Sequence, residues 1–413
     1  MKLRIPIPLL ALEIVFVWCA SAQSYDTNGA VVQTFAGSGF SGYVDGVGLQ
    51  TMFSDPRKVV ANSAGNLFVL DFGNSRIRKI TPGGTVSTFA GGGAGSLPGY
   101  GTNVSLGLTY YSAMAIDHSD ALWIPTSSGM LRIRSDAYVT KTNLGGLSFT
   151  SGVCVDSGNN IYYSGGNQIY RWGSNGVAEV FAGSGNLGAV DGNGIFTSFS
   201  NPGALAADAA DNIYVWDTGN FLIRKISQNR DVATIAGHNT GGGPTDVDGV
   251  GTNAAFGFIS AMCVDNSGNL ILGCGDPGSS IRKMTATTNV TTIAGSFTQA
   301  GYTNGTGSAS RFRATGVCVS QGMIFVADYG NQRIRNITFN PSTQPVLPAN
   351  LQLNTYSGLQ IIGTVGRTYQ IESSPDMGTW TTCATLLLNS SPYLWIDQNP
   401  VNGTKFYRAL LLP

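Results

Sequence analysis

Short apolar runs alternate with clusters of glycine, asparagine, aspartate and serine along most of this chain. The clearest case is segment 66–80, in which the apolar arms Leu67 to Leu70 and Ile77 to Ile80 flank Asp71-Phe72-Gly73-Asn74. Apolar arms around residues that tolerate left-handed backbone predict a β-hairpin with a tight turn. Close variants of this segment return down the sequence, which indicates a repeat protein.

Each repeat also carries one apolar strand before the hairpin and one after it. The predicted inner strands share a run that usually ends in aspartate, and they are Lys58 to Asn62, Ala113 to Asp117, Gly152 to Asp156, Ala204 to Asp208, Ala261 to Asp265 and Gly316 to Ser320. The predicted outer strands end in glycine, and they are Val31 to Gly37, Thr88 to Gly91, Val180 to Gly183, Thr234 to Gly237 and Thr292 to Gly295. Repeats of four strands, with six inner strands in the chain, predict a six-bladed β-propeller.

The two ends of the repeat region are complementary. The outer strand Val31 to Gly37 precedes every inner strand, whereas the last repeat, Gly316 to Ile337, lacks an outer strand. We expect the N-terminal strand to complete the sixth blade, because closing the ring removes two open sheet edges. The propeller would then span residues 31–340.

The rest of the chain adds a second all-β part. Prolines in residues 341–350 predict a linker, and the β-like segments of residues 351–413 predict a small C-terminal β-sandwich. The expected fold class is therefore all-β, a six-bladed β-propeller followed by a small β-sandwich.

Two hairpins carry a resemblance to a known family. Asp71 to Ile77 and Asp328 to Ile334 resemble the hairpins of NHL-repeat β-propellers, which end in an Asn-x-Arg-Ile motif. Blade four departs from this pattern at Leu222 and blade two at Thr126, so identical sites in every blade are not expected. In the C-terminal part, residues 366–374 with Trp380 and Phe406-Tyr407-Arg408 resemble a fibronectin-type-III module of secreted bacterial proteins.

Charge and the N-terminus narrow the possible partners and compartment. Lys+Arg and Asp+Glu number 23 each, so no basic surface for nucleic acid or an anionic membrane is expected. Residues 1–22 begin with Lys2 and Arg4, continue with a mostly apolar run and end in Ala20-Ser21-Ala22, which is typical of a secretion signal. No later run is long enough to span a bilayer. We expect a monomer that is secreted, periplasmic or at the cell surface.

Two groups of residues that could carry chemistry are better explained structurally. Asp71 with Arg76, and Asp328 with Arg333, lie at the two ends of a turn and predict local ion pairs. Cys154, Cys263, Cys274 and Cys318 lie on predicted strands in positions that do not face one another, so we expect buried free thiols.

No cofactor is expected. The two histidines, His118 and His238, are too few for a histidine-built catalytic zinc site. Resemblance to NHL-like propellers nevertheless implies an alternative, because some of these proteins are lyases or lactonases with a metal in the central channel.

The loops between outer and inner strands are the strongest candidates for function. They and the hairpin turns emerge on the same face of the ring, which we name the long-loop face. The aspartates and aromatic residues predicted to bind a ligand there are Tyr43, Asp45, Phe72, Tyr100, Asp191, Asp248, Tyr302 and Tyr329.

The predicted function is that of an exported, non-enzymatic scaffold that binds a protein or a glycan through this face. The alternatives are a metal-dependent lactonase or lyase with its site in the channel, and a propeller that the C-terminal module anchors or sorts.

Overall fold

The computed structural model describes residues 29–144, 151–173, 176–238, 246–275 and 278–339, and in the C-terminal part 350–354, 358–362, 364, 366–374, 378–388, 393–396 and 406–412. These residues form two compact units, one within Gln23–Gln344 and one within Pro345–Pro413. The predicted signal peptide, 1–22, and all of the predicted linker 341–350 except Asn350 lie outside the described residues. None of the helices in the described part is long and apolar enough to cross a membrane.

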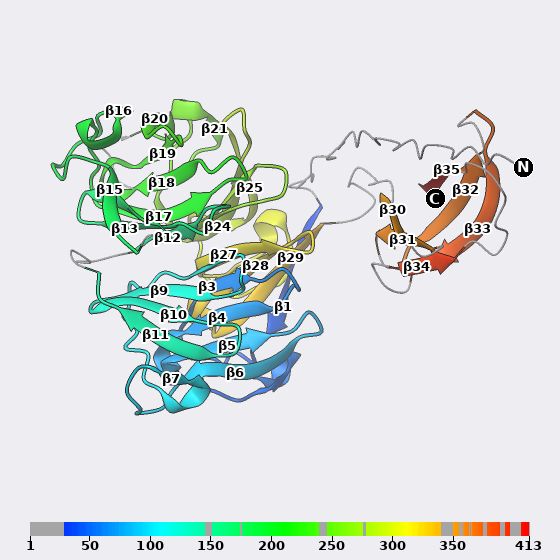
Figure 1. The fold of residues 1–413 in the computed structure, drawn as a ribbon, viewed down its shortest axis with the longest axis horizontal. Coiled ribbons are helices and arrows are strands. Elements are labelled where there is room, and N and C mark those ends of the chain that lie inside the picture. Colours follow the sequence, from blue (N-terminus) through cyan, green and yellow to red (C-terminus); the bar gives the residue numbers. More distant parts are fainter. Residues whose placement is uncertain are drawn as a thin grey trace, which may run out of the picture. The chain divides into compact units, whose positions relative to one another are not determined.

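The first unit is a six-bladed β-propeller, and each blade is an antiparallel sheet (Figure 1). From the outer edge inward, blade one contains β2 (Gly46–Val47), β6 (Thr85–Gly91), β5 (Arg76–Ile80), β4 (Leu67–Asp71) and β3 (Pro56–Ala61). Blade two contains β7 (Gly99–Tyr100), β11 (Tyr138–Thr142), β10 (Gly129–Ile133), β9 (Leu122–Thr126) and β8 (Ala115–Ile116). Blade three contains β15 (Ala178–Ala182), β14 (Gln168–Trp172), β13 (Ile161–Gly165) and β12 (Val153–Val155). Blade four contains β16 (Gly192–Asn193), β20 (Asp231–Ala236), β19 (Leu222–Ile226), β18 (Ile213–Asp217) and β17 (Pro202–Ala207). Blade five contains β21 (Gly249–Val250), β25 (Asn289–Ser296), β24 (Ser279–Met284), β23 (Leu270–Gly275) and β22 (Phe258–Val264). Blade six contains β26 (Gly305–Thr306), β1 (Ala30–Ala36), β29 (Arg333–Phe339), β28 (Met323–Asp328) and β27 (Ala314–Ser320).

The expectation of four strands per blade was wrong for all blades except blade three. A two-residue strand lies outside the expected outer strand in the other five sheets of the described propeller. In blade one it pairs Gly46 with Val86 and Val47 with Thr85. Short 3-10 turns follow these strands or close the hairpins: η1 (Gly48–Gln50), η2 (Phe72–Asn74), η3 (Gly101–Asn103), η4 (Gly194–Phe196), η5 (Thr218–Asn220), η6 (Gly251–Asn253), η7 (Gly307–Ala309) and η8 (Tyr329–Asn331). The Asp-Gly loops therefore fold back onto their own blades.

The ring closes through the N-terminal strand, as predicted. β1 pairs antiparallel with β29, with Val32 opposite Ile337 and Thr34 opposite Arg335. It lies between β29 and β26 in the sheet of blade six, where its backbone pairs on both sides. The strand that opens the repeat region thus satisfies the edge that the last hairpin leaves open.

Buried phenylalanines hold neighbouring blades together. Phe53, Phe199, Phe256 and Phe312, one after each of four long loops, are at most 2% exposed. Phe53 packs in one cluster with Val59 of blade one and Phe325 of blade six. The aromatic residue at the end of the loop therefore lies between blades, where removing a ring would leave a cavity.

The second unit contains two three-stranded sheets. One has the order β30 (Asn350–Asn354), β31 (Gly358–Ile362), β34 (Tyr393–Ile396), and the other β33 (Thr381–Leu387), β32 (Thr368–Ser374), β35 (Phe406–Leu411). Ile361 of the first sheet and Tyr369, Ile371 and Ala409 of the second share one buried cluster. The small β-sandwich predicted from the sequence is confirmed.

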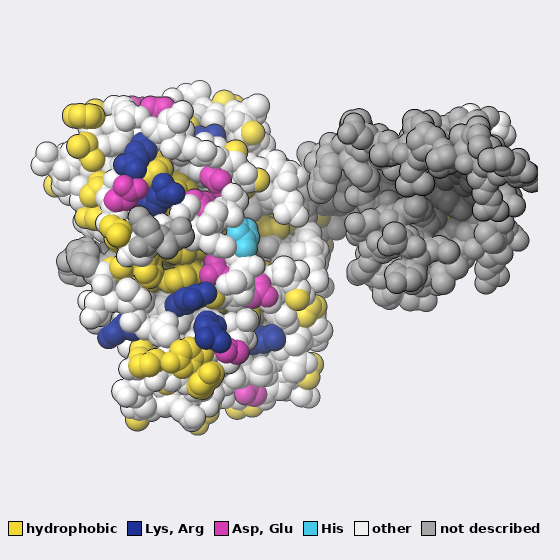
Figure 2. Space-filling view, in the orientation of Figure 1, with side chains coloured by type: hydrophobic (Ala, Val, Ile, Leu, Met, Phe, Trp, Pro, Cys, Tyr) yellow, Lys and Arg dark blue, Asp and Glu magenta, His cyan; other side chains and the backbone are white. Residues whose placement is uncertain are grey.

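Charged side chains are sparse and mixed in sign on the visible face of the propeller (Figure 2). Basic and acidic residues lie interspersed on it, and hydrophobic side chains form several separate patches (Figure 2). This arrangement agrees with the equal numbers of basic and acidic residues in the sequence, 23 of each.

Candidate functional site

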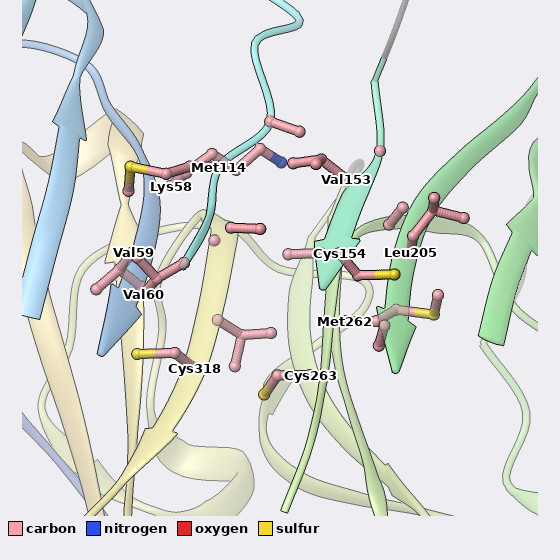
Figure 3. Close-up of a pocket in the computed structure, with 18 of the residues that line it drawn as sticks. Lys58, Val59, Val60, Met114, Val153, Cys154, Leu205, Met262, Cys263 and Cys318 are labelled. Atoms are coloured by element: carbon pink, nitrogen blue, oxygen red, sulfur yellow. The ribbon is translucent and has the colours of Figure 1, made fainter. Parts of the chain in front are cut away.

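The inner strands of all six blades enclose a cavity of about 300 Å³. Its walls are mostly small and apolar side chains, because each inner strand presents alanine, valine, methionine or cysteine to the centre of the ring. Figure 3 shows Lys58 extending across one end of the cavity, with Cys263 and Cys318 toward the other end. Lys58 lies near the start of β3, so its end of the cavity opens toward the long-loop face.

An aromatic cluster surrounds Arg57 at this end of the cavity. Arg57 is the extra residue of a β-bulge between Pro56 and Lys58, which places it outside the regular ladder. Its guanidinium carbon lies 3.5 Å from the ring centroid of Tyr110 and 5.2 Å from those of Phe72 and Tyr329. We name Arg57, Phe72, Tyr110, Tyr111 and Tyr329 the mouth cluster.

The mouth cluster is rigid at its base and open above. Asp55 accepts two hydrogen bonds from Arg57, at 3.0 and 2.8 Å, and Arg57 is only 7% exposed. The ring of Tyr110 meets those of Phe72 and Tyr111 edge to face, at 6.1 and 5.2 Å. Tyr110 and Tyr111 remain 54% and 59% exposed, which is unusual for such large side chains. The cluster therefore presents preorganised aromatic surface to solvent.

The predicted aromatic residues divide into an inner and an outer group. Phe72 and Tyr329, from blades one and six, meet around Arg57 in the mouth cluster. Tyr43, Tyr100 and Tyr302 instead belong to the outermost strands or the loops that lead into them. The structure thus brings two of the five predicted aromatic residues together.

Each outer tyrosine is held within its own blade or by the neighbouring strand. Tyr43 lies over Arg76, with 4.2 Å between its ring centroid and the guanidinium carbon. Tyr302 lies over Arg333 at 3.8 Å, and its hydroxyl is 3.0 Å from Thr34 Oγ1. Tyr100 packs on Tyr138 with 4.6 Å between the centroids.

The three predicted aspartates bind buried arginines. Asp45, Asp191 and Asp248 form ion pairs with Arg78, Arg224 and Arg282, whose side chains are fully buried. Each aspartate also accepts hydrogen bonds from the backbone and side chain of a threonine on the outer strand: Thr88, Thr234 and Thr292. These carboxylates tie the long loop to its blade, and their oxygens are largely occupied.

The hairpin aspartates pair with a different arginine from the predicted one. Asp71 binds Arg78 at 3.0 Å and Asp328 binds Arg335 at 2.9 Å, so the pairing with Arg76 and Arg333 was wrong. Arg76 instead donates to the carbonyl of Asn74 at the turn. Arg78 lies two residues further from the turn than Arg76, diagonally across the strand pair from Asp71. A long arginine side chain still reaches the aspartate from that position.

Burial raises the pKa of these hairpin carboxyls. That of Asp71 rises to about 6, while hydrogen bonds from Asn74 and the Ser54 amide and the charge of Arg78 oppose the shift. The pKa values of Asp217 and Asp328 rise for the same reason. Each of the three carboxyls lies within ion-pair distance of a buried arginine: Arg78, Arg224 and Arg335.

The five cysteines in the described residues are free. Cys263 lies opposite Ile271 and Cys274 opposite Ile259, so these two cysteines do not face one another, as predicted. Burial raises the pKa of Cys263 to about 12, and it raises the pKa values of Cys154, Cys274 and Cys318 as well. These thiols stay protonated and pack as small apolar groups.

The cavity lining does not fit the metal site of a lactonase or lyase. Its described residues supply thiols, hydroxyls and one amine, but no carboxylate or imidazole. Among the described residues, no group of three histidine, cysteine, aspartate or glutamate side chains could hold a metal ion. His238 Nδ1 is 3.0 Å from the carbonyl of Ala254, and His118 is exposed in a turn.

The sequence pattern missed Arg57, Tyr110 and Tyr111. Tyr110 and Tyr111 lie in the loop that leads into β8, a loop without the Asp-Gly motif used to find the others. Arg57 lies just before the predicted inner strand, which begins at Lys58, and the observed strand β3 begins two residues earlier, at Pro56. A usable signal was the position of all three residues just before or at the start of an inner strand, which places them at the channel mouth.

Comparison with known families supports the repeat assignment. The NHL repeat family matches residues 53–80, which include β3, β4 and β5 of blade one. This confirms the resemblance to NHL-repeat β-propellers. No curated protein matches the sequence.

Solved structures share the propeller architecture. An auxiliary nutrient binding protein from Bacteroides ovatus ATCC 8483 aligns with a TM-score of 0.58 at 16% identity, covering 76% of this chain and 77% of that one. A similarly described protein from Bacteroides thetaiotaomicron VPI-5482 aligns with a TM-score of 0.57 at 16% identity, covering 75% and 76%. A structural genomics protein of unknown function from Bacteroides thetaiotaomicron VPI-5482 aligns at 0.61 and 19%, covering 75% and 76%. At such identities these similarities show the fold alone.

Proposed function

We propose that this chain is an exported, non-enzymatic binding propeller whose mouth cluster recognises a glycan, with a protein as the alternative ligand. The observation that carries the proposal is the group of exposed, preorganised rings around Arg57 at the end of the central cavity. Two structures with the same architecture are described as auxiliary nutrient binding proteins, which agrees with a binding role.

The chemistry of the mouth cluster suits a sugar ring. A pyranose has an apolar face of C–H groups and a rim of hydroxyls, and aromatic side chains with polar tips match both features. Tyr110 and Tyr111 offer ring faces and hydroxyls together, and both are more than half exposed. Because Asp55 fixes Arg57 beneath the rings, binding would order few additional side chains.

Export remains part of the proposal and rests on the sequence of residues 1–22. The domain limits, with a propeller over 31–340 and a C-terminal module over 351–413, and the fibronectin-type-III character of that module also remain proposals. An anchoring or sorting role for the module is compatible with binding by the propeller, since the two units form separate cores.

The test is a glycan array probed with the chain from residue 23 onward, with affinity capture from culture medium as the route to a protein ligand. The best ligand is then titrated against Tyr110→Ala and Tyr329→Ala, and we expect each change to weaken binding at least tenfold, because central aromatic residues dominate most interfaces. Tyr100→Ala is the matched control, since Tyr100 is 57% exposed but lies on the outermost strand.

Three results would overturn this function. The first is unchanged binding by both mouth-cluster variants. The second is equal loss of binding in Tyr100→Ala, which would move the site to the outer rim. The third is full retention of binding by a C-terminal fragment from residue 345 when the matching propeller fragment binds nothing.

A further inference from the structure

Lys58 is the one charged residue among those that line the described central cavity. The other walls come from valine, alanine, methionine, leucine, isoleucine and cysteine, with a few serine and glycine residues at the same end as Lys58. The cavity therefore has one charged end and otherwise apolar walls. Such a cavity suits a ligand that has one polar end group and an apolar chain.

Two backbone carbonyls hold the Lys58 ammonium in place. Nζ donates to the carbonyl oxygens of Ser260 and Thr315, at 2.7 and 2.9 Å. Both residues are the extra residues of β-bulges, in β22 and β27, and so stand outside the regular ladders. An ammonium has three donors, and these two carbonyls are its only hydrogen-bond acceptors among the described residues. One N–H is left to bind a ligand.

The Lys58 charge also lacks a counter-ion. No carboxylate in the described part of the chain lies within ion-pair distance of Nζ, and the adjacent Arg57 adds a second positive charge. Burial, and then the charge of Arg57, lowers the pKa of Lys58 to about 8. The fold therefore keeps a cation in a position where it costs stability, and an anion would relieve that cost.

The far end of the cavity completes an apolar wall. Cys154, Cys263 and Cys318 line it, and burial keeps their thiols protonated. They add no negative charge that would repel an anion. A volume of about 300 Å³ is at the lower end of the range for small-molecule sites.

We propose that the central cavity binds a medium-chain aliphatic carboxylate, with the carboxylate on Lys58 Nζ and the chain along Met114, Val153, Leu205 and Met262. This site is separate from the mouth cluster, and the proposal does not depend on glycan binding. The ion pair would supply specificity and the buried chain would supply affinity. Each additional buried methylene should strengthen binding about fourfold, until the cavity is filled.

The probes are sodium octanoate and octan-1-ol, which have the same chain length and differ in charge. Titration calorimetry should show octanoate binding at least tenfold more tightly than octanol, and hexanoate about fifteenfold more weakly than octanoate. Methyl NMR should show octanoate shifting the signals of Met114 and Met262, which line the cavity, while Met130 and Met284, which do not, stay unchanged.

Two variants test the role of the charge. Lys58→Met should reduce octanoate affinity to that of octanol and leave octanol binding unchanged. Lys79→Met is the matched control, because Lys79 is a half-buried lysine on β5 outside the cavity, and it should bind octanoate like the unmodified protein.

The proposal fails if octanoate binds no more tightly than octanol, if Lys58→Met retains octanoate affinity, or if the shifts appear at Met130 and Met284 instead. The comparison of the two probes and the NMR measurement use the unmodified protein, so they decide the outcome even if Lys58→Met does not fold.

Discussion

The inner and outer parts of the long-loop face use similar residues for different purposes. At the outer rim Asp45 pairs with Arg78, and Tyr43 lies over Arg76, so both side chains are occupied within blade one. At the channel mouth Arg57 gathers rings from three blades, and one of them, Tyr110, stays more than half exposed, as does the adjoining Tyr111. The outer residues complete the blades, whereas the inner tyrosines leave ring surface exposed to solvent.

Blade five shows how strongly the outer rim is built for stability. Cys274 stands where blade four has Asp217, so the hairpin carboxylate is missing. Asp246, from the loop, replaces it and lies 3.3 Å from the buried Arg282, beside Asp248. A buried arginine without a counter-ion would destabilise the fold, and Asp246 supplies the missing negative charge.

This difference teaches that an aspartate or tyrosine on a loop indicates binding only when its hydrogen-bonding groups or ring faces remain available. Groups that cost stability where they are, such as Lys58, are better candidates than groups that the fold already satisfies. The predictions below test the contrast from the largest expected effect to the smallest.

Removing the buried arginine of blade one should give the largest loss. Arg78→Met leaves Asp71 buried without its ion pair and frees the loop at Asp45, so we expect the free energy of unfolding to fall by about 3–5 kcal/mol. Urea denaturation measures this loss. Arg76→Met, on the same strand but half-buried, should cost less than about 1 kcal/mol. Equal losses would show that the turn arginine is the structural partner.

Removing the cavity lysine should have the opposite sign. The pKa of Lys58 is lowered from 10.5 to about 8 in the folded protein, so the ammonium of this half-buried lysine destabilises the fold fully below pH 8 and no longer does so above pH 10.5. The substitution also removes two hydrogen bonds to the carbonyls of Ser260 and Thr315, which offsets part of the gain. We therefore expect Lys58→Met to raise the free energy of unfolding at pH 7 by about 1–2 kcal/mol. The gain should shrink between pH 8 and pH 10.5. A variant that is less stable at pH 7 would contradict an uncompensated charge.

Replacing the loop aspartate should cost an intermediate amount that depends on the new side chain. Asp45→Ala removes the acceptor for Arg78 and Thr88, and we expect a loss of about 1–2 kcal/mol. Asp45→Asn should cost less than half as much, because blade six uses Asn304 in this role and its Oδ1 accepts from Arg335 at 2.7 Å. Equal losses in thermal melts of the two variants would mean that charge, not hydrogen bonding, fixes the loop.

Truncating the exposed tyrosines should have the smallest effect on stability. Tyr110→Ala and Tyr100→Ala both remove a side chain that is more than half exposed, so each should change the free energy of unfolding by less than about 1 kcal/mol. The two should differ only in ligand binding. A large loss in Tyr110→Ala alone would show that the mouth cluster holds blades together.

The sequence by itself determined the number of blades and the strand that closes the ring. These features depend on local hydrophobic periodicity, which repeats and can be aligned within one chain. Ring closure was predictable because the outer strand Val31 to Gly37 precedes the first inner strand, while the last repeat lacks an outer strand. The register around Cys263 was equally accessible, because side chains alternate strictly along a strand.

Only the tertiary structure decided which polar and aromatic residues meet. Arg78 rather than Arg76 binds Asp71, because the reach of a long side chain across a twisted sheet is not contained in strand pairing. Arg57 meets Tyr110 and Tyr329 because the ring brings blades two and six together around blade one. Lys58 finds carbonyls more than 200 positions away, at Ser260 and Thr315. Contacts between blades depend on the closed ring, whereas the hydrophobic pattern of a strand indicates only the strands that pair with it in its own blade.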